Sequence, residues 1–142
     1  MTNAVYPKAL EGLISGLIDL DTAVIKAALV RGYTYSSSHT FMSDVTGAGG
    51  TVNAASAALS SVTVSLGVFD AADTTITTTA NATNHVLIIY QASAVTGGAD
   101  VASSSQRLVA YFDTGTGLPI QPGTGDVAVT FDNGTNKIIK FG

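Results

Sequence analysis

The sequence contains no cysteine and no tryptophan, and it has two histidines and one glutamate among its 142 residues. The absence of cysteine excludes disulfides and thiolate metal sites, so packing and hydrogen bonds must stabilise the fold. His39 and His85 stand in no metal-binding motif, and Glu11 has no acidic neighbour in sequence, although the fold can still assemble a carboxylate pair. We expect no catalytic, cofactor-binding or metal-binding residue, and we expect that the protein is not an enzyme.

Charged residues are also scarce. They make up 11% of the chain, less than half of the roughly 25% that is typical of soluble domains. The net charge is −4, and no basic residue occurs between Arg31 and Arg107. We therefore expect no nucleic-acid partner, because a phosphate backbone requires a basic patch. A neutral surface of small polar residues is poorly protected against self-association. We expect neighbouring chains to cover much of it, in a homo-oligomer or a larger assembly.

Long hydrophobic runs are missing as well. The longest, such as residues 86–90, are far shorter than the ~20 residues that cross a bilayer, so we expect no membrane partner. The N-terminal sequence MTNAVYPKALEG lacks the basic and apolar regions of a secretory signal. We expect a soluble chain made in the cytoplasm, with residues 1–142 in a single domain. That domain would have an N-terminal helix at about 6–18 and a β-rich body at about 22–142.

The N-terminal segment has the spacing of an amphipathic helix. Apolar residues recur at the i, i+3, i+4, i+7 positions of one face, namely Leu10, Leu13, Ile14 and Leu17. Pro7 suits the first helical turn. Gly12 and Gly16 weaken the helix by about 1 kcal/mol each relative to alanine, so we expect it to lie on a sheet or on a partner.

The rest of the chain is typical of short strands separated by turns. Residues 22–30 are apolar and β-branched, which predicts a strand buried on much of both faces, with a helical continuation as the alternative. Residues 33–51 predict a loop with one helical turn at 39–45. The later expected strands cover residues 61–69, 74–79, 85–92, 107–114, 126–132 and 137–141. The sequence therefore predicts a mainly β fold, a β-sandwich or barrel-like domain with one short N-terminal helix.

The last two of these strands carry a hairpin signal. Val127, Val129 and Phe131 alternate with polar or small residues. A turn sequence, Asp-Asn-Gly at 132–134, then separates them from a second apolar segment at 137–141. This pattern predicts that the two strands pair with each other.

Two pairs of aspartates are candidate cation ligands. Asp19 with Asp21, and Asp70 with Asp73, offer oxygens to a hard cation, but neither pair matches an EF-hand loop. Turn and cap roles are the favoured interpretation. The glycine-rich run at 115–125 lacks the Lys-Ser/Thr ending of a phosphate loop, so it is interpreted as a connector.

Two stretches resemble a widespread family of small tailed-bacteriophage proteins. Residues 6–30, YPKALEGLISGLIDLDTAVIKAALV, are similar to the family's opening helix, acidic turn and strand. Residues 117–141, GLPIQPGTGDVAVTFDNGTNKIIKF, are similar to its closing hairpin, and residues 107–113 to the strand before it. Together these cover about two fifths of the chain. The resemblance implies a virion structural component at the head or the head–tail region, made in the host cytoplasm, and it carries over no functional residues.

From these observations we expect a bacteriophage capsid decoration (cement) protein that contacts the major capsid or other virion proteins. Aromatic and large apolar residues are typical interface anchors. The expected assembly contacts are Tyr6, Leu10, Leu13, Tyr33, Tyr35 and Phe41, with burial in the core as the alternative for the same residues.

Two further interpretations stay open. Within the same class, the chain is a tail, collar or fibre-like component of the virion. From another class, it is a carbohydrate- or ligand-binding β-sandwich that uses a surface aromatic and an aspartate-bound calcium ion.

Overall fold

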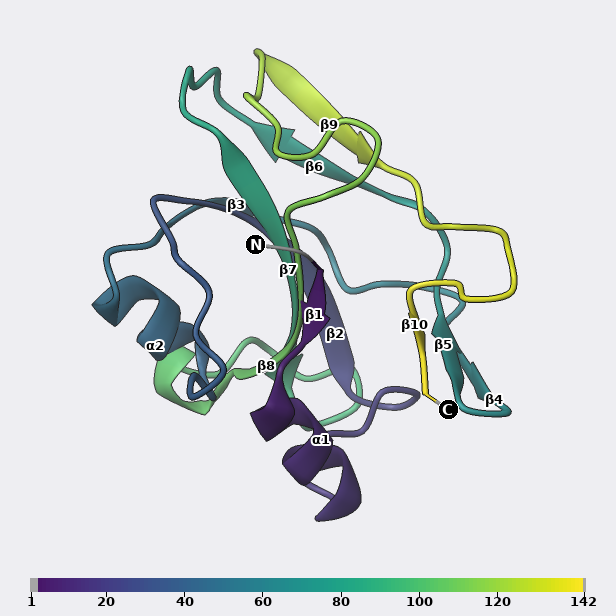
Figure 1. Ribbon diagram of the computed structural model, residues 1–142. Helices are drawn as coiled ribbons and strands as arrows, with labels where there is room; N and C mark the ends of the chain where they lie inside the picture. Colours follow the sequence, from purple (N-terminus) through teal and green to yellow (C-terminus); the bar gives the residue numbers. More distant parts are fainter. Residues whose placement is uncertain (1–2, 142) are drawn as a thin grey trace.

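The computed structural model describes residues 3–141 (Figure 1). The elements in chain order are β1 (Ala4–Val5), α1 (Pro7–Ile14), β2 (Val24–Arg31), α2 (Met42–Gly47), β3 (Thr51–Ala55), β4 (Thr63–Ser65), β5 (Val68–Asp70), β6 (Thr74–Thr78), β7 (His85–Ser93), the 3-10 helix η1 (Ser103–Ser105), β8 (Arg107–Phe112), β9 (Gly125–Val129) and β10 (Ile139–Lys140). Among these residues no helix is long and apolar enough to cross a membrane.

A five-stranded antiparallel sheet forms the centre of the molecule, in the order β1-β8-β7-β2-β3. Its central strands β2 and β7 are buried along nearly their whole length. Both sequences are apolar on both faces, which is the composition of a strand covered from two sides. The expected strand at 22–30 is therefore confirmed, and its helical alternative is wrong.

Different elements cover the two faces of this sheet. Ala28 pairs with Ile88, and Ile88 pairs with Tyr111, so these side chains share one face. Tyr111 contacts the rings of the 33–41 loop on that face. On the other face Leu87 and its neighbours line a cavity together with residues of β9 and the segment before β10. Figure 1 shows α2 to the left of the sheet and the β10-β5-β4 sheet to its right.

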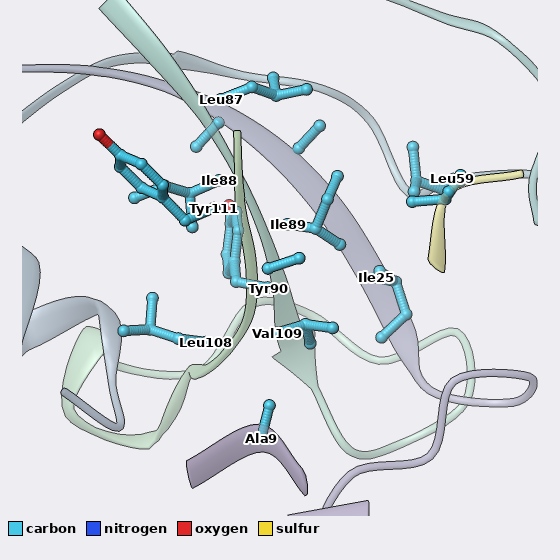
Figure 2. Close-up of a cluster of buried hydrophobic side chains, with 14 of the residues drawn as sticks. Ala9, Ile25, Leu59, Leu87, Ile88, Ile89, Tyr90, Leu108, Val109 and Tyr111 are labelled. Carbon is cyan, nitrogen blue, oxygen red and sulfur yellow. The ribbon is translucent and has the colours of Figure 1, made fainter. Parts of the chain in front are cut away.

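Buried aliphatic side chains of β2, β7 and β8 form the core between these layers (Figure 2). Ile88, Ile89 and Val109 have no exposed surface. Figure 2 places Ala9 of α1 at one end of this cluster and Leu59 at another. The mainly β fold with a short N-terminal helix is confirmed. The sheets stay open, so the arrangement is sandwich-like and not a closed barrel.

Helix α1 is shorter than the predicted span of 6–18. It ends at Ile14 because Gly16 adopts a positive φ of 73° and two reverse hydrogen bonds close the turn, Gly16 N to Leu13 O and Leu17 N to Gly12 O. These bonds define a Schellman motif, for which glycine is the preferred residue. The second helix, α2, overlaps the helical turn expected at 39–45.

The predicted pairing of the last two strands is wrong. β9 pairs with β6, and β10 pairs with β5. The intervening segment is held elsewhere, because Phe131 is buried and its backbone N–H donates to Asp73 Oδ1 at 2.8 Å. The alternation of Val127 and Val129 correctly indicates a half-buried strand, but alternation does not specify the partner strand.

Two other predictions of strands also need correction. Residues 61–69, expected to be one strand, form the β4–β5 hairpin with its turn at Leu66 and Gly67. Val62, Val64, Leu66 and Val68 alternate at a period of two, which conceals this turn in the sequence. Strand β3 falls partly in the expected loop at 33–51 and extends beyond it.

Because the chain has no cysteine, engineered disulfides can test the pairing of β9. Thr75 and Ala128 are exposed register partners in β6 and β9, and directly opposed residues lie within disulfide reach. We expect Thr75→Cys/Ala128→Cys to form an intramolecular disulfide under mild oxidation, detected by intact-mass spectrometry after thiol labelling. Ala128→Cys/Lys140→Cys is the control and should keep free thiols. Free thiols in the first variant and a disulfide in the second would show instead that β9 pairs with β10.

Candidate assembly surface

The expected assembly contacts fall into two groups. Tyr6 and Tyr33 are core residues, with 0% and 8% of their surface exposed. For these two the core alternative holds, because a partner cannot reach them in this fold. Tyr35 and Phe41 are half-buried, as is Leu13 of α1, while Leu10 is exposed.

The aromatic residues fasten the 33–41 loop to the sheet. The Tyr6 hydroxyl donates to the Tyr33 hydroxyl at 3.2 Å, and the Tyr33 hydroxyl also shares a hydrogen bond of 2.8 Å with His39 Nδ1. Tyr35 packs against the rings of Tyr6 and Tyr111 at centroid distances of 5.1 and 5.3 Å. Burial, followed by the hydrogen bond with Tyr33, raises the pKa of Tyr6, so its hydroxyl stays neutral at physiological pH.

Phe41 marks the end of this loop. The guanidinium carbon of Arg107 lies 5.0 Å from the centroid of the Phe41 ring, in a cation–π contact. Thr40 O accepts a hydrogen bond from Leu108 N, and Gln106 O accepts one from Met42 N. The end of the loop is therefore hydrogen-bonded to the start of β8. The aromatic side chains of the loop mainly stabilise the fold.

Tyr33→Phe tests this role of the cluster. The change leaves the buried Tyr6 hydroxyl without its acceptor, so we expect the free energy of unfolding to fall by about 1–3 kcal/mol. Denaturant unfolding measures it. Tyr35→Phe, in the same cluster, keeps its ring contacts and should change stability by less than about 0.5 kcal/mol. Equal losses in both variants would show that the hydroxyl network contributes nothing particular.

Asp44, in the first turn of α2, anchors the same loop. Its Oδ2 accepts from the backbone N–H groups of Phe41 and Thr40, at 2.9 and 2.8 Å. These hydrogen bonds lower the pKa of Asp44, because they favour the ionised carboxylate.

The stability that ionised Asp44 contributes should depend on pH. Its folded pKa lies below that of the unfolded chain, about 4, so the contribution is complete above that value and is lost as the pH falls through the folded pKa. We expect Asp44→Asn to unfold about 1 kcal/mol more easily than the wild type at pH 7. This difference should shrink below pH about 4 in denaturant titrations at several pH values. A gap of equal size at pH 2 and pH 7 would contradict the assignment.

The aspartate pairs that were candidate cation ligands have local partners. Asp19 accepts from Thr22 Oγ1 at 2.6 Å and from the backbone N–H of Asp21 at 3.2 Å. Hydrogen bonds with Asp21 and then Thr22 lower the pKa of Asp19 to about 2. Asp70 lies 3.5 Å from Lys137 Nζ, and Asp73 binds the Phe131 backbone. Between residues 3 and 141 no group of three or more His, Cys, Asp or Glu side chains is arranged to hold a metal ion.

Helix α1 turns most of its predicted apolar face away from the body of the protein. It packs through Ala9 and Gly12, which are buried, whereas Leu10 and Ile14 are 40% and 89% exposed. A Cβ at position 12 would lie 2.9 Å from Ile18 Cδ1, so glycine permits the close approach of the helix and the following turn. Of the two supports expected for the helix, a sheet or a partner, the chain's own sheet does not cover these exposed positions.

The exposed apolar residues are concentrated on α1, the turn after it and the β4–β5 hairpin. Among residues 3–141 eight large hydrophobic side chains are exposed, and five belong to α1, its C-terminal turn and the β4–β5 hairpin: Leu10, Ile14, Leu17, Val64 and Leu66. A groove of about 520 Å³ runs between α1 and this hairpin. We call it the α1–hairpin groove; its lining residues are Leu10, Leu13, Ile14, Gly16, Ile18, Asp19, Leu20, Val64, Gly67, Val68, Phe69 and Phe141.

Sequence reasoning found only one wall of this groove. Leu10 and Leu13 were expected contacts and line it, whereas the hairpin wall, with Val64, was read as part of one continuous strand. The signal that could have revealed the turn is Gly67, a residue that interrupts a strand pattern and supplies a positive φ.

A second cavity, of about 340 Å³, lies on the face of the five-stranded sheet that carries Leu87. It is lined largely by apolar residues, including Leu29, Leu87 and Phe131, with Asp132 and Lys137 at its margin. This cavity is the feature that the ligand-binding interpretation would use. Comparison of the chain with protein-family models, curated proteins and solved structures finds no match.

Proposed function

We propose that this protein is a structural component of a bacteriophage virion, and specifically a capsid decoration protein that binds other virion proteins. The α1–hairpin groove carries the proposal, because it gathers exposed apolar side chains at one site. Large contiguous apolar patches on a protein surface mark contacts with proteins or membranes, or ligand grooves.

The chemistry of the groove suits a protein partner. Of its twelve lining residues one is ionisable, Asp19. Covering such a surface removes apolar area from water and desolvates almost no charge, which is the favourable balance at the centre of a protein interface. Small-molecule sites, by contrast, combine an apolar pocket with several polar groups that fix the ligand's orientation.

The rest of the surface supports the same conclusion. The charged fraction of 11% leaves a coat of threonine, serine, alanine and glycine that is compatible with close contact to neighbouring subunits. The resemblance of residues 6–30, 107–113 and 117–141 to a family of small tailed-phage proteins is what directs the proposal to the virion. In this role each copy bridges shell subunits, and many weak identical contacts together stabilise the head.

Cryo-electron microscopy of purified phage particles tests this function. We expect density that fits the fold and repeats over the icosahedral lattice of the head. Density confined to the tail vertex would contradict the decoration role and favour the tail, collar or fibre alternative.

A binding assay complements the imaging. We expect the purified chain to co-sediment with heads from which it has been stripped, at a saturable number of sites. Absence from the particle, together with a melting temperature that rises with calcium or a glycan, would contradict a virion role and favour the ligand-binding alternative.

A further inference from the structure

The turn of the β4–β5 hairpin holds a leucine in an unfavourable backbone conformation. Ser65 and Val68 are register partners, so Leu66 and Gly67 form a two-residue turn, with φ values of +51° and +75°. Positive φ at both positions defines the type I′ family of turns, for which Asn-Gly is the preferred sequence. A leucine in the left-handed region costs roughly 1–2 kcal/mol relative to its ordinary conformation.

This leucine gains nothing from packing within its own chain. The Leu66 side chain is 97% exposed. The turn beneath it is held firmly, because Phe141 N donates to Gly67 O at 2.8 Å and a Cβ at position 67 would meet Phe141 O at 2.8 Å. Neither stability nor solubility of the single chain therefore accounts for leucine at this position, whereas a partner that buries it would.

The α1–hairpin groove begins next to this leucine. Val64, Gly67 and Val68 of the hairpin line one wall, and Ile14 of α1, which is 89% exposed, stands on the opposite wall. One face of the chain thus carries both a projecting apolar side chain and an apolar groove of about 520 Å³. Leu66 does not fill the groove of its own chain.

We propose that the occupant of the α1–hairpin groove is a second copy of this chain. A two-fold axis between two copies places each Leu66 in the other's groove, and each Ile14 beside the other's hairpin. In such an isologous contact each groove is filled by the partner copy's Leu66. The same surface is used on both copies, so the assembly stops at the dimer. The inference rests on the proposed structural function and identifies the partner at its main contact surface.

The exposed apolar side chains supply more than half of the area that such a pair needs. Leu10, Ile14, Val64 and Leu66 together expose on the order of 500 Å² per copy, compared with about 800 Å² per partner in a standard interface. The half-buried Leu13 and Phe141 add to it. The 33–41 loop and the β6–β9 ribbon do not line the groove and stay available to shell proteins.

Leu66→Asn separates association from folding. Asparagine suits the positive φ of this turn position, so the monomer should be at least as stable as wild type. The dimer should lose two symmetric leucine contacts, and we expect its Kd to rise at least ~100-fold. Sedimentation velocity over a concentration series measures the association. Denaturant unfolding at concentrations where both proteins are monomeric measures the stability.

Two further variants complete the experiment. Ile14→Asn changes the opposite wall and should weaken the dimer in the same way. Val52→Asn, on the edge strand β3 and outside the groove, replaces an exposed valine and should leave the Kd unchanged. A wild-type chain that stays monomeric at high micromolar concentration would overturn the proposal. A dimer that persists in both Leu66→Asn and Ile14→Asn would also overturn it.

The same proteins distinguish this inference from the proposed function. A wild-type dimer that depends on Leu66 and does not bind phage heads would support the pairing and contradict the decoration role. A monomeric wild type that binds heads, and loses binding in Leu66→Asn, would overturn the pairing, because the groove region would then contact a shell protein.

Discussion

The pairing of β2 with β7 is the interaction on which the rest of the structure depends. Eight residues of β2 pair with β7, and side chains such as Leu29 and Ile88 are at most 1% exposed. Each buried aliphatic side chain contributes about 1.5–3 kcal/mol. Because both strands are apolar on both faces, neither face of the sheet can remain in water, and the remaining elements form two covering layers.

How those layers meet the sheet determines what the molecule offers to partners. The aromatic side chains of the 33–41 loop are used in covering one face, which removes Tyr6 and Tyr33 from the surface. Helix α1 approaches through Ala9 and Gly12, so its larger apolar residues point outward. Because α1 packs on the protein through these small residues, its larger apolar side chains form one wall of the α1–hairpin groove. The β4–β5 hairpin forms the other wall.

The sequence predicted individual elements better than the contacts between them. The strands at 85–92 and 107–114 and the N-terminal helix were evident because their apolar patterns are local. The hairpin at 126–141 and the single strand at 61–69 were wrong for the same reason. Alternation reports which side of a strand is buried, and it specifies neither the neighbour on each edge nor a turn that preserves the period. Gly67 is the only sequence signal for that turn, and the positive φ values of Leu66 and Gly67 show where it lies.

The sequence by itself determined a mainly β fold with low surface charge, in which disulfides have no part, because these properties follow from composition and local periodicity. Tertiary structure alone decided that Tyr6 is core while Ile14 is exposed, although both belong to the helix predicted at about 6–18. The physical reason is that burial depends on which side of the helix approaches the sheet. Glycine and alanine permit the closest approach, and their small side chains carry little signal in a hydrophobic pattern.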